Sequence, residues 1–360
     1  MSESRPLVRL VVLYGGQSAE HDVSRVSAAH VLKAIDTTRY EVEPIAITPD
    51  GQWLRSDATI AALAAGPDAL PGVLDASGTA LEPQASVAPA RPGQQVVVLP
   101  ILHGPRGEDG AVQGLLELAG VAYAGSGVLG SAVNMDKVMA KVVAAAAGLP
   151  IVRYLAVRDT GADGAFIAQV GQELGWPVFV KPANMGSSVG VARADDGAGL
   201  VAALDDALSF DEWAVVEEAV NAREIEVGVL GNHSPRASVP GEIVPTHEFY
   251  DYDDKYLDGN AEMVVPADLP VEVADQAREL AVTAFKALRC DGLARVDFFY
   301  EEAGRGLLFN EINTMPGFTP YSMFPSLWAA TGVPYAELID EIVALALARH
   351  EHRSPHRRQR

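Results

Sequence analysis

Near the C-terminal end of the chain, two apolar runs carry polar side chains in a pattern that could hold a cation. Residues 292–313 read GLARVDFFYEEAGRGLLFNEIN, two strand-like runs with a polar, glycine-containing link between them. A link of that kind is typical of an antiparallel hairpin. Side chains alternate between the two faces of a strand, so Arg295 and Asp297 share a face of the first run. By the same alternation, Glu311 and Asn313 share a face of the second run.

If those two faces coincide, the oxygens of Asp297, Glu311 and Asn313 lie close together. Mg²⁺ prefers hard oxygen ligands and takes only a few of them from protein, completing its shell with water and phosphate oxygens. Arg295 beside them could hold a phosphate or a developing negative charge. The hairpin therefore predicts a magnesium site, with a salt-bridged rim of a sheet as the alternative.

A second pattern, VKPANMGSSVGV at residues 180–191, combines a lysine with glycines and serines. Lys181 follows an apolar run, and the small residues after it would let backbone N–H groups approach an anion closely, with serine hydroxyls as added donors. The lysine precedes the glycines and no helix follows, so this is not the phosphate loop that ends in Lys-Ser or Lys-Thr. The segment indicates an anion-binding loop, and a plain hairpin turn is the alternative.

Three charged residues elsewhere carry weaker signals. Lys137 lies in a helical pattern, where a lysine is usually solvated. Glu217 and Glu224 bracket a link between two predicted strands, and such a link could offer backbone groups to a purine. By itself, none of the three identifies a site.

Two further segments have the character of a site edge and a lid. Glu20 follows a Gly-Gly turn after the first predicted strand and stands at the start of a helix, a usual ligand-binding edge of an α/β sheet. A carboxylate is also favourable there as a helix-capping charge, which is the alternative. Lys255 and Tyr256 lie at the centre of a long polar and aromatic segment, and long loops in compact domains often serve as lids.

The apolar runs divide the chain into three predicted regions that must position these side chains. Residues 1–135 alternate strands with helices, which predicts an open α/β domain with parallel strands. Residues 136–220 predict a small α+β domain. Residues 221–360 alternate strands with one strong helix and end in another helix.

Amphipathic patterns predict the main helices. One runs through NMDKVMAKVVAAAAGLP, from residue 134 until a glycine and a proline stop it. Two others cover VEVADQARELAVTAFKALR at 271–289 and YAELIDEIVALALARH at 335–350. Residues 56–95, rich in Ala, Gly and Pro, predict surface helix and loop with little chemistry.

Composition narrows the classes of protein to consider. A chain of 360 residues, 49% hydrophobic and 21% charged, is ordinary for a globular protein of two or three domains. A net charge of -21 repels nucleic acid and anionic membranes, so neither is expected as a partner. The basic segment at 353–360 is the exception and is interpreted as a solvated tail.

Cysteine usage and hydropathy point to a cytoplasmic protein. The chain contains one cysteine, Cys290, so no intrachain disulfide can form. With no secretory signal, we expect the reducing cytoplasm as its location. No run approaches the roughly 18 apolar residues that a membrane span needs.

Taken together and in order, eight segments resemble the D-alanine–D-alanine ligase family of the ATP-grasp superfamily. They are GGQSAEHDVS, LHGPRGEDG, MDK, VKPANMGSSVGV, VEEAVNAREIEV, FYDYDDKY, ARVDFF and NEINTMPGFTPYS. The resemblance implies a mixed α/β, ATP-grasp fold of three domains, beginning with the open parallel α/β domain. It also implies ATP-dependent ligation of two D-alanines through a D-alanyl phosphate, for peptidoglycan precursors.

The same resemblance implies a role for each matching residue. ATP contacts are expected from Lys137, Lys181, Ser187, Ser188, Val189, Glu217, Ala219, Val220, Glu224, Lys255, Asn310 and Glu311. Two Mg²⁺ ions, with Mn²⁺ as a substitute, are expected on Asp297, Glu311 and Asn313. Substrate contacts are expected from Glu20, Val23, His103, Tyr256, Arg295, Gly317, Ser322 and Met323. Catalytic roles are expected for Glu20, His103, Ser187, Tyr256, Arg295 and Gly317.

The expected substrate sites follow the predicted regions. The first D-alanine is expected against 1–135, with Glu20 holding its ammonium group in a network with Ser187 and Tyr256. The phosphate-covering loop belongs to 136–220. The magnesium ions and the second D-alanine, with its carboxylate at Ser322, belong to 221–360.

Other functions stay open at this point. One is a D-alanine–D-lactate ligase or another ATP-grasp carboxylate-amine ligase, and one is a nucleotide-binding protein without catalysis. Tyr256 favours an amine acceptor, because family members that accept D-lactate lack a tyrosine at the matching loop position. Met323 stands where leucine is common in the family. The family also suggests a homodimer.

Overall fold

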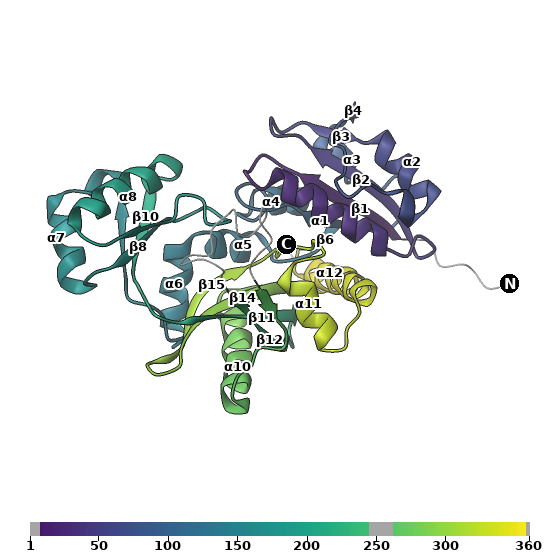
Figure 1. The fold of residues 1–360 in the computed structure, drawn as a ribbon. Coiled ribbons are helices and arrows are strands. Elements are labelled where there is room, and N and C mark those ends of the chain that lie inside the picture. The colour runs from purple at the N-terminus through teal and green to yellow at the C-terminus, as the bar shows by residue number, and fades with distance from the viewer. Residues whose placement is uncertain (1–7, 245–261, 358–360) are drawn as a thin grey trace.

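The computed structural model describes residues 8–244 and 262–357, with side chains described as far as 353. Three sheets come from three successive stretches of the chain (Figure 1). The chain therefore has the mixed α/β architecture that the sequence predicted. The division into domains at 135/136 and 220/221 stays a prediction.

The first sheet is parallel at its centre and antiparallel at one edge. Its strands lie in the order β4 (Thr79–Ala80), β3 (Trp53–Arg55), β2 (Tyr40–Ile47), β1 (Val8–Gly15), β5 (Val96–Ile101) and β6 (Ala122–Tyr123). Strand β1 pairs in parallel with β2 and β5, and β5 with β6, whereas β3 and β4 add antiparallel pairs. The helical segments of this stretch are α1 (His21–Ala34), α2 (Asp57–Ala65), η1 (Pro67–Ala69), α3 (Pro83–Ser86), α4 (Ala111–Ala119) and α5 (Val128–Met135).

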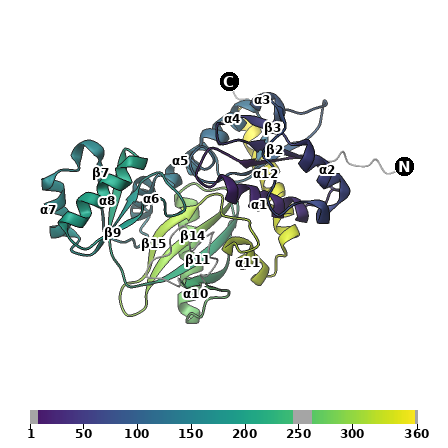
Figure 2. The same ribbon diagram turned by 45° about the horizontal axis from the view of Figure 1, so that its top comes forward.

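Both faces of β1 are buried, because helices cover both sides of the sheet. Leu10 and Val12 pack in one core with α1 and with the last helix of the chain, α12 (Tyr335–Arg357). Val11 and Leu13 pack in a second core with α4. The period of two along the strand places alternate residues in the two cores. Figure 2 shows α12 running beside the first sheet.

The second sheet is small, antiparallel and covered by two helices. Its strands are β7 (Tyr154–Arg158), β10 (Trp213–Glu218), β8 (Val178–Pro182) and β9 (Ala192–Ala194), in that order. A short 3-10 segment, η2 (Asp159–Gly161), follows β7. Helices α7 (Gly164–Glu173) and α8 (Gly197–Phe210) pack on the sheet through one apolar core.

The third sheet is antiparallel and carries Arg295, Asp297, Glu311 and Asn313 on two of its strands. Its strands are β13 (Glu262–Val264), β12 (Arg236–Val244), β11 (Arg223–Gly231), β14 (Gly292–Glu301) and β15 (Gly306–Asn313). Helices α10 (Val271–Ala287) and α6 (Lys137–Ala146) share its core, and α11 (Met323–Ala330) contacts β11 and β12. The predicted hairpin is therefore β14 and β15, the two last strands of this sheet.

The helix predicted from residue 134 to the glycine stop is divided. Asp136 is extended, with φ -84° and ψ 104°, and separates α5 from α6. Its Oδ1 accepts from the N–H groups of Val138 and Met139, both at 2.9 Å. An aspartate at an N-cap accepts hydrogen bonds from backbone N–H groups of the first turn in this way, which favours the start of a new helix over continuation of the previous one. The amphipathic period continued across the break, which is why periodicity alone missed it.

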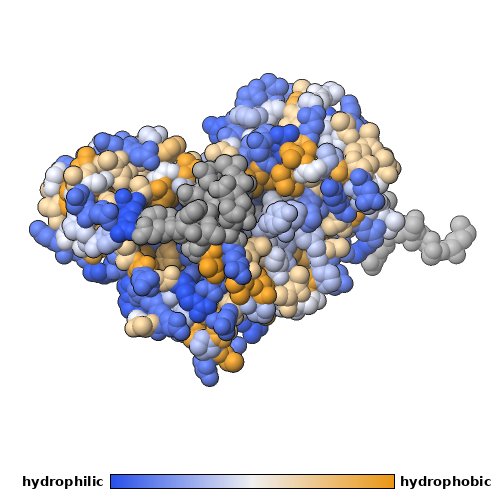
Figure 3. Space-filling view, viewed as in Figure 1, coloured by the Kyte–Doolittle hydropathy of each residue, from blue (hydrophilic) through white to orange (hydrophobic). Residues whose placement is uncertain are grey.

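The last helix is longer than predicted. It runs to Arg357 rather than ending near 350, so the basic segment at 353–360 begins within α12 and not as a tail. None of the helices in the described ranges is both long and apolar enough to cross a membrane. Figure 3 shows hydrophilic residues over most of one face, with hydrophobic residues in smaller patches.

Candidate active site

A cavity of about 1440 Å³ lies between elements of all three stretches. Predicted residues that line it are Glu20, Val23, His103, Lys137, Lys181, Ser187, Ser188, Val189, Glu217, Val220, Glu224, Arg295, Asp297, Asn310, Glu311, Asn313, Gly317, Ser322 and Met323. The tertiary structure thus gathers these residues around one space. Ala219 is absent from the lining, and its N–H donates to the Pro177 carbonyl at 3.1 Å. Lys255 and Tyr256 lie outside the described residues.

The polar faces of β14 and β15 coincide. Asp297 pairs directly with Glu311, and Arg295 pairs with Asn313. Direct partners in an antiparallel pair project from the same face. The Asn313 Nδ2 donates to Asp297 Oδ2 at 2.8 Å, which leaves its Oδ1 as the oxygen that it could offer a cation.

A β-bulge adds Asn310 to the same site. The register steps from Asp297–Glu311 to Phe298–Phe309, so Asn310 has no partner on β14. Strict alternation would place Asn310 and Glu311 on opposite faces, yet both line the cavity. An extra residue in one strand changes the direction of the side chains around it.

The donor set on this hairpin fits Mg²⁺ in chemistry. Two carboxylates and a carboxamide give hard oxygens on one face, and water and phosphate oxygens could complete the shell. Within the described ranges, no group of three or more His, Cys, Asp or Glu residues forms a metal site from protein alone.

Arg295 lies between the carboxylates of Asp297 and Glu226. Its Nε lies 2.8 Å from Asp297 Oδ1 and 2.9 Å from Glu226 Oε2, and its Nη2 lies 2.7 Å from Asp297 Oδ2. Burial alone would lower the pKa of Arg295, but the two carboxylates outweigh it and raise the pKa. The salt-bridged rim that the sequence left as an alternative is therefore present, on the same residues as the predicted metal site.

Glu217 is held between two lysines. Its Oε2 accepts from Lys181 Nζ at 2.7 Å, and its Oε1 lies 2.8 Å from Lys141 Nζ. Burial would raise the pKa of Glu217, but the two ammonium groups lower it to about 2. Lys141 also donates to the Asn310 carbonyl at 3.2 Å, and burial lowers its pKa.

The sequence analysis gave Lys141 no role. It follows Lys137 by four residues, and residues at that spacing lie on one side of a helix. Lys137 is not a solvated helical lysine, because its ammonium group donates to the Met185 carbonyl and lies 3.9 Å from Glu311 Oε2. Helix α6 therefore directs Lys137, which lines the cavity, toward the Gly/Ser loop, and directs the buried Lys141 toward Glu217.

The Gly/Ser loop reaches across the cavity to the first stretch of the chain. Ser187 donates its hydroxyl to Glu20 Oε1, and a Cβ at Gly186 would lie 2.8 Å from Glu20 Oε2. Ser187 and Ser188 have φ of 51° and 59°, a left-handed backbone that costs energy for residues other than glycine. A contact between two side chains that are 167 residues apart in the sequence thus holds the loop over Glu20.

Glu20 does not use its carboxylate as a helix cap. It stands at the N-cap position of α1, where no side-chain capping bond is made. The side chain is buried in the cavity wall instead, with an exposed fraction of 8%. Glu20 therefore makes no capping hydrogen bond, while its charge still stands at the start of α1, as the alternative predicted.

His103 and Glu108 join the first stretch to the loop that follows β15. His103 Nδ1 lies 3.1 Å from the Met315 carbonyl, so this nitrogen carries the hydrogen and Nε2 is left as an acceptor. No hydrogen-bond partner of Nε2 is found in the described part of the chain, and burial lowers the pKa of His103. The ring is neutral in that form.

Glu108 is a second residue that received no role from the sequence. Its Oε1 accepts from the Gly104 N–H at 2.9 Å, and its Oε2 accepts from the Met315 N–H at 3.3 Å. Burial, with the nearby Glu20, raises the pKa of Glu108 to about 8. Its only sequence signal was its place in the segment LHGPRGEDG.

Gly317 and Ser322 lie close together before α11. A Cβ at Gly317 would lie 2.7 Å from Ser322 Oγ, so only glycine fits there without a shift. Ser322 Oγ accepts from the Thr319 N–H at 2.9 Å and stands at the N-cap of α11. A helix start favours a negative charge nearby.

The fold and the cavity define a class of enzyme. One antiparallel sheet contributes Lys181, the other contributes the paired carboxylates of Asp297 and Glu311, and α6 adds Lys137. Glu20 joins them from the loop that follows β1 in the first sheet. This is an ATP-grasp fold, as in the solved structures that it matches. Family models for D-ala D-ala ligase match residues 9–126 as the N-terminus and 143–344 as the C-terminus. The chain belongs to the D-Ala–D-Ala ligase family and is an ATP-dependent ligase.

Individual relatives agree over nearly the whole chain. A D-alanine–D-alanine ligase of Geobacillus kaustophilus is 48% identical over 356 residues, covering 94% of this chain and 95% of the relative. That of Paenarthrobacter aurescens is 46% identical over 361 residues, covering 95% of each.

Solved structures match as closely in shape. The D-alanine-D-alanine ligase from Coxiella burnetii has a TM-score of 0.82 at 34% identity, covering 98% of each chain. The VanG D-Ala:D-Ser ligase from Enterococcus faecalis has a TM-score of 0.81 at 32% identity, covering 94% of this chain and 99% of that one.

Proposed function

We propose that this chain joins two D-alanines to D-alanyl-D-alanine, using ATP and releasing ADP and phosphate, as a step toward peptidoglycan. The observation that carries the proposal is the contact between Ser187 and Glu20. It brings the anion-binding loop against the carboxylate that would hold an amino-acid ammonium group. Phosphate and amino acid would therefore meet in one enclosed space.

In the first step, a carboxylate oxygen of the first D-alanine attacks the γ-phosphorus of ATP, and ADP leaves. Both reactants are anions, so the protein must offset their repulsion. Lys137 and Lys181 would hold the phosphates, and Glu20 would hold the ammonium group of the amino acid. Asp297, Glu311 and Asn313 would hold Mg²⁺, which shields phosphate charge when it is bound.

Glu217 bears on this step through Lys181. In the structure Lys181 is paired with Glu217 at 2.7 Å, a geometry that keeps the ammonium group charged and fixed. Lys141 shares the negative charge of Glu217, so Lys181 retains net positive charge to offer a phosphate. We therefore propose Lys141 as a positioning residue.

In the second step, the amine of the second D-alanine attacks the carbonyl carbon of the acyl phosphate, and phosphate leaves. The oxyanion that forms would lie near Arg295 and the Gly317 N–H. The carboxylate of the second D-alanine would lie at Ser322, beside the start of α11. The attacking nitrogen loses protons on the way, and a network through Ser187 and Tyr256 is the proposed route.

Some properties of this function are proposed on the family alone. They are two bound Mg²⁺ ions, a homodimer and a cytoplasmic location. Metal titration against turnover and sedimentation velocity would test the first two.

Phosphate release with different acceptors tests the function. We expect release with D-alanine alone, none with L-alanine alone, and no ester product when D-lactate is added at neutral pH. Mass spectrometry identifies the dipeptide. Absence of ATP turnover with D-alanine would refute the proposal, and a D-alanyl-D-lactate product would move it to the alternative ligase.

A further inference from the structure

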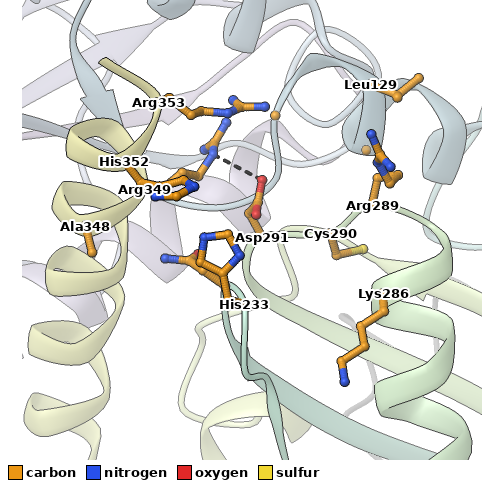
Figure 4. Close-up of a pocket in the computed structure, with 13 residues that line it drawn as sticks. Leu129, His233, Lys286, Arg289, Cys290, Asp291, Ala348, Arg349, His352 and Arg353 are labelled. Atoms are coloured by element: carbon orange, nitrogen blue, oxygen red, sulfur yellow. Dashed lines mark ion pairs between the residues drawn. The ribbon is translucent and has the colours of Figure 1, made fainter. Parts of the chain in front are cut away.

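A second cavity, of about 410 Å³, lies apart from the active site (Figure 4). It opens where the end of α10, the start of α5 and the last described turns of α12 meet. No residue lines both cavities. Four cationic side chains line the second one, namely Lys286, Arg289, Arg349 and Arg353.

The charge of this cavity is opposite to that of the chain. The whole chain carries -21, yet the lining holds four cations against one carboxylate, Asp291. Outside the lining, Glu117 Oε1 lies 3.1 Å from Arg353 Nη1 and 3.6 Å from Arg349 Nη2, so four cations face two carboxylates in all. His233 and His352 also line it, with their rings 4.6 Å apart in an edge-to-face arrangement. A concave surface with one sign of charge concentrates ions of the opposite sign.

One wall of the cavity is built rigidly. Arg349 donates to the Gly125 carbonyl and to the Tyr123 hydroxyl, both at 2.8 Å, and its guanidinium lies 4.4 Å from the centre of the Tyr123 ring. Its Nε lies 3.2 Å from Asp291 Oδ2. A Cβ at Gly127 would lie 2.8 Å from Arg349 Nη2, so glycine leaves the room that the guanidinium needs.

The other wall carries two less tightly held cations, although the charge of Arg289 acts on Asp291. Lys286 and Arg289 are exposed, and no ion pair of either is found in the described part of the chain. Figure 4 shows them across the cavity from α12, on the side where Cys290 also lies. Positive charge near the end of α10 also favours its helix dipole, but this accounts only for the charge and not for the enclosed space.

We propose that this cavity binds a multivalent phosphate-type anion. Orthophosphate, pyrophosphate and the phosphate end of a nucleotide share this chemistry. Arginine pairs with phosphate oxygens through two parallel N–H groups, and lysine adds a compact charge. The fixed Arg349 and Asp291 would form the floor, while Lys286 and Arg289, for which no ion pair is found in the described ranges, would supply further positive charge.

Calorimetry on the full chain tests the proposal. The active site is first filled with a non-hydrolysable ATP analogue, Mg²⁺ and a phosphinate dipeptide mimic, and excess Mg²⁺ is removed by gel filtration. Orthophosphate, pyrophosphate and ADP are then titrated separately. We expect one site per chain for at least one of them, with pyrophosphate tightest because it carries the highest charge for its size.

Two double variants with the same change of charge decide whether the cavity is the site. Lys286→Gln with Arg289→Gln should weaken binding at least about tenfold, since two charge-assisted bonds are lost. Lys33→Gln with Arg278→Gln, both exposed and outside the cavity, should change it less than about twofold. Circular dichroism and unaltered turnover would show that each variant is folded, and Arg289→Gln alone is used if the double variant is not.

Two outcomes of these titrations would overturn the proposal. No binding of any of the three anions to the filled enzyme overturns the proposal. Equal weakening in both double variants also overturns it, because the anion would then respond to net charge and not to this cavity. The anion that binds most tightly identifies the source of the phosphate group.

Discussion

Glu311 shows how much chemistry one residue of this site carries. It lies beside Asp297 on the neighbouring strand and within 3.9 Å of Lys137. It therefore stands where a metal ion, a phosphate and a lysine would meet. The carboxylate matters there for its charge and its oxygens, since it contributes little apolar packing.

Glu311→Gln should therefore remove most of the turnover while leaving the fold intact. Losing even an outer partner of a metal typically costs about 10- to 100-fold, and losing a ligand should cost at least about 100-fold. Turnover is measured over a range of Mg²⁺ concentrations. Glu302→Gln, exposed in the link of the same hairpin, serves as the control. Near-normal activity of Glu311→Gln at limiting Mg²⁺ would contradict the assignment.

Glu108 should make the folded state less stable as pH rises. A salt-bridged carboxylate, whose pKa is lowered on folding, has the opposite effect. The pKa of Glu108 rises from 4.5 to about 8 on folding, so the folded state binds the proton more tightly than the unfolded state. The free energy of unfolding therefore falls as pH rises through this window and levels off above pH 8.

Glu108→Gln should remove that dependence. The variant is expected to be less stable at pH 5, because an amide nitrogen cannot accept the Met315 N–H. The gap between variant and wild type should narrow from pH 5 to pH 8, as followed by urea unfolding. Glu302→Gln supplies the baseline. A gap that stays constant or widens would show that Glu108 is ionised throughout.

At the scale of elements, the start of α6 places two lysines at the site. Asp136 ends α5, caps α6 and so fixes the first turn that carries Lys137. The orientation of Lys141, one turn later, follows from the same cap. If Lys137 binds a phosphate as proposed, this N-cap also serves the site.

Asp136→Ala should destabilise the protein by about 1 kcal/mol, the usual cost of losing an N-cap side chain. It should also raise the KM for ATP, because the first turn of α6 would fray. Asp136→Asn keeps the capping oxygen and is the matched control. If both variants unfold at the same denaturant concentration, the cap contributes nothing measurable.

At the scale of the whole molecule, the end of the chain helps to build its beginning. Leu338 in α12 is fully buried in the core that contains Leu10 and Val12 of β1. The Tyr40 hydroxyl donates to Asp340 Oδ1 at 2.8 Å across the same contact. The first sheet therefore needs α12 to bury one of its faces.

Leu338→Ala should cost about 2–5 kcal/mol of unfolding free energy, as for other large-to-small changes in cores. Hydrogen exchange should show faster opening of β1, far away in the sequence. Leu118→Ala, at a site that is 86% exposed, should change stability by less than about 0.5 kcal/mol. Unchanged exchange in β1 would mean that α12 is dispensable for the first sheet.

Much of the fold and site was predictable from local patterns. Alternation assigned Arg295, Asp297, Glu311 and Asn313 to their faces, and β14 and β15 then paired with those faces together. Such patterns repeat every two or four residues, so they can be recognised from residues that are close together in the sequence. They could not place Asn310, because a bulge interrupts the period. They also missed the break at Asp136, where a capping side chain outweighs a continuing apolar pattern.

The sequence by itself determined the chemical inventory: the lysines, the hard oxygens, the small-residue loop and the order of motifs that marks the family. The tertiary structure decided which of these groups face one another. It set Glu217 between Lys141 and Lys181, closed Ser187 onto Glu20 and joined Glu108 to Met315. The physical reason is that each of these contacts joins residues far apart in the chain. Their proximity depends on how whole sheets and helices pack, which no short-range period encodes.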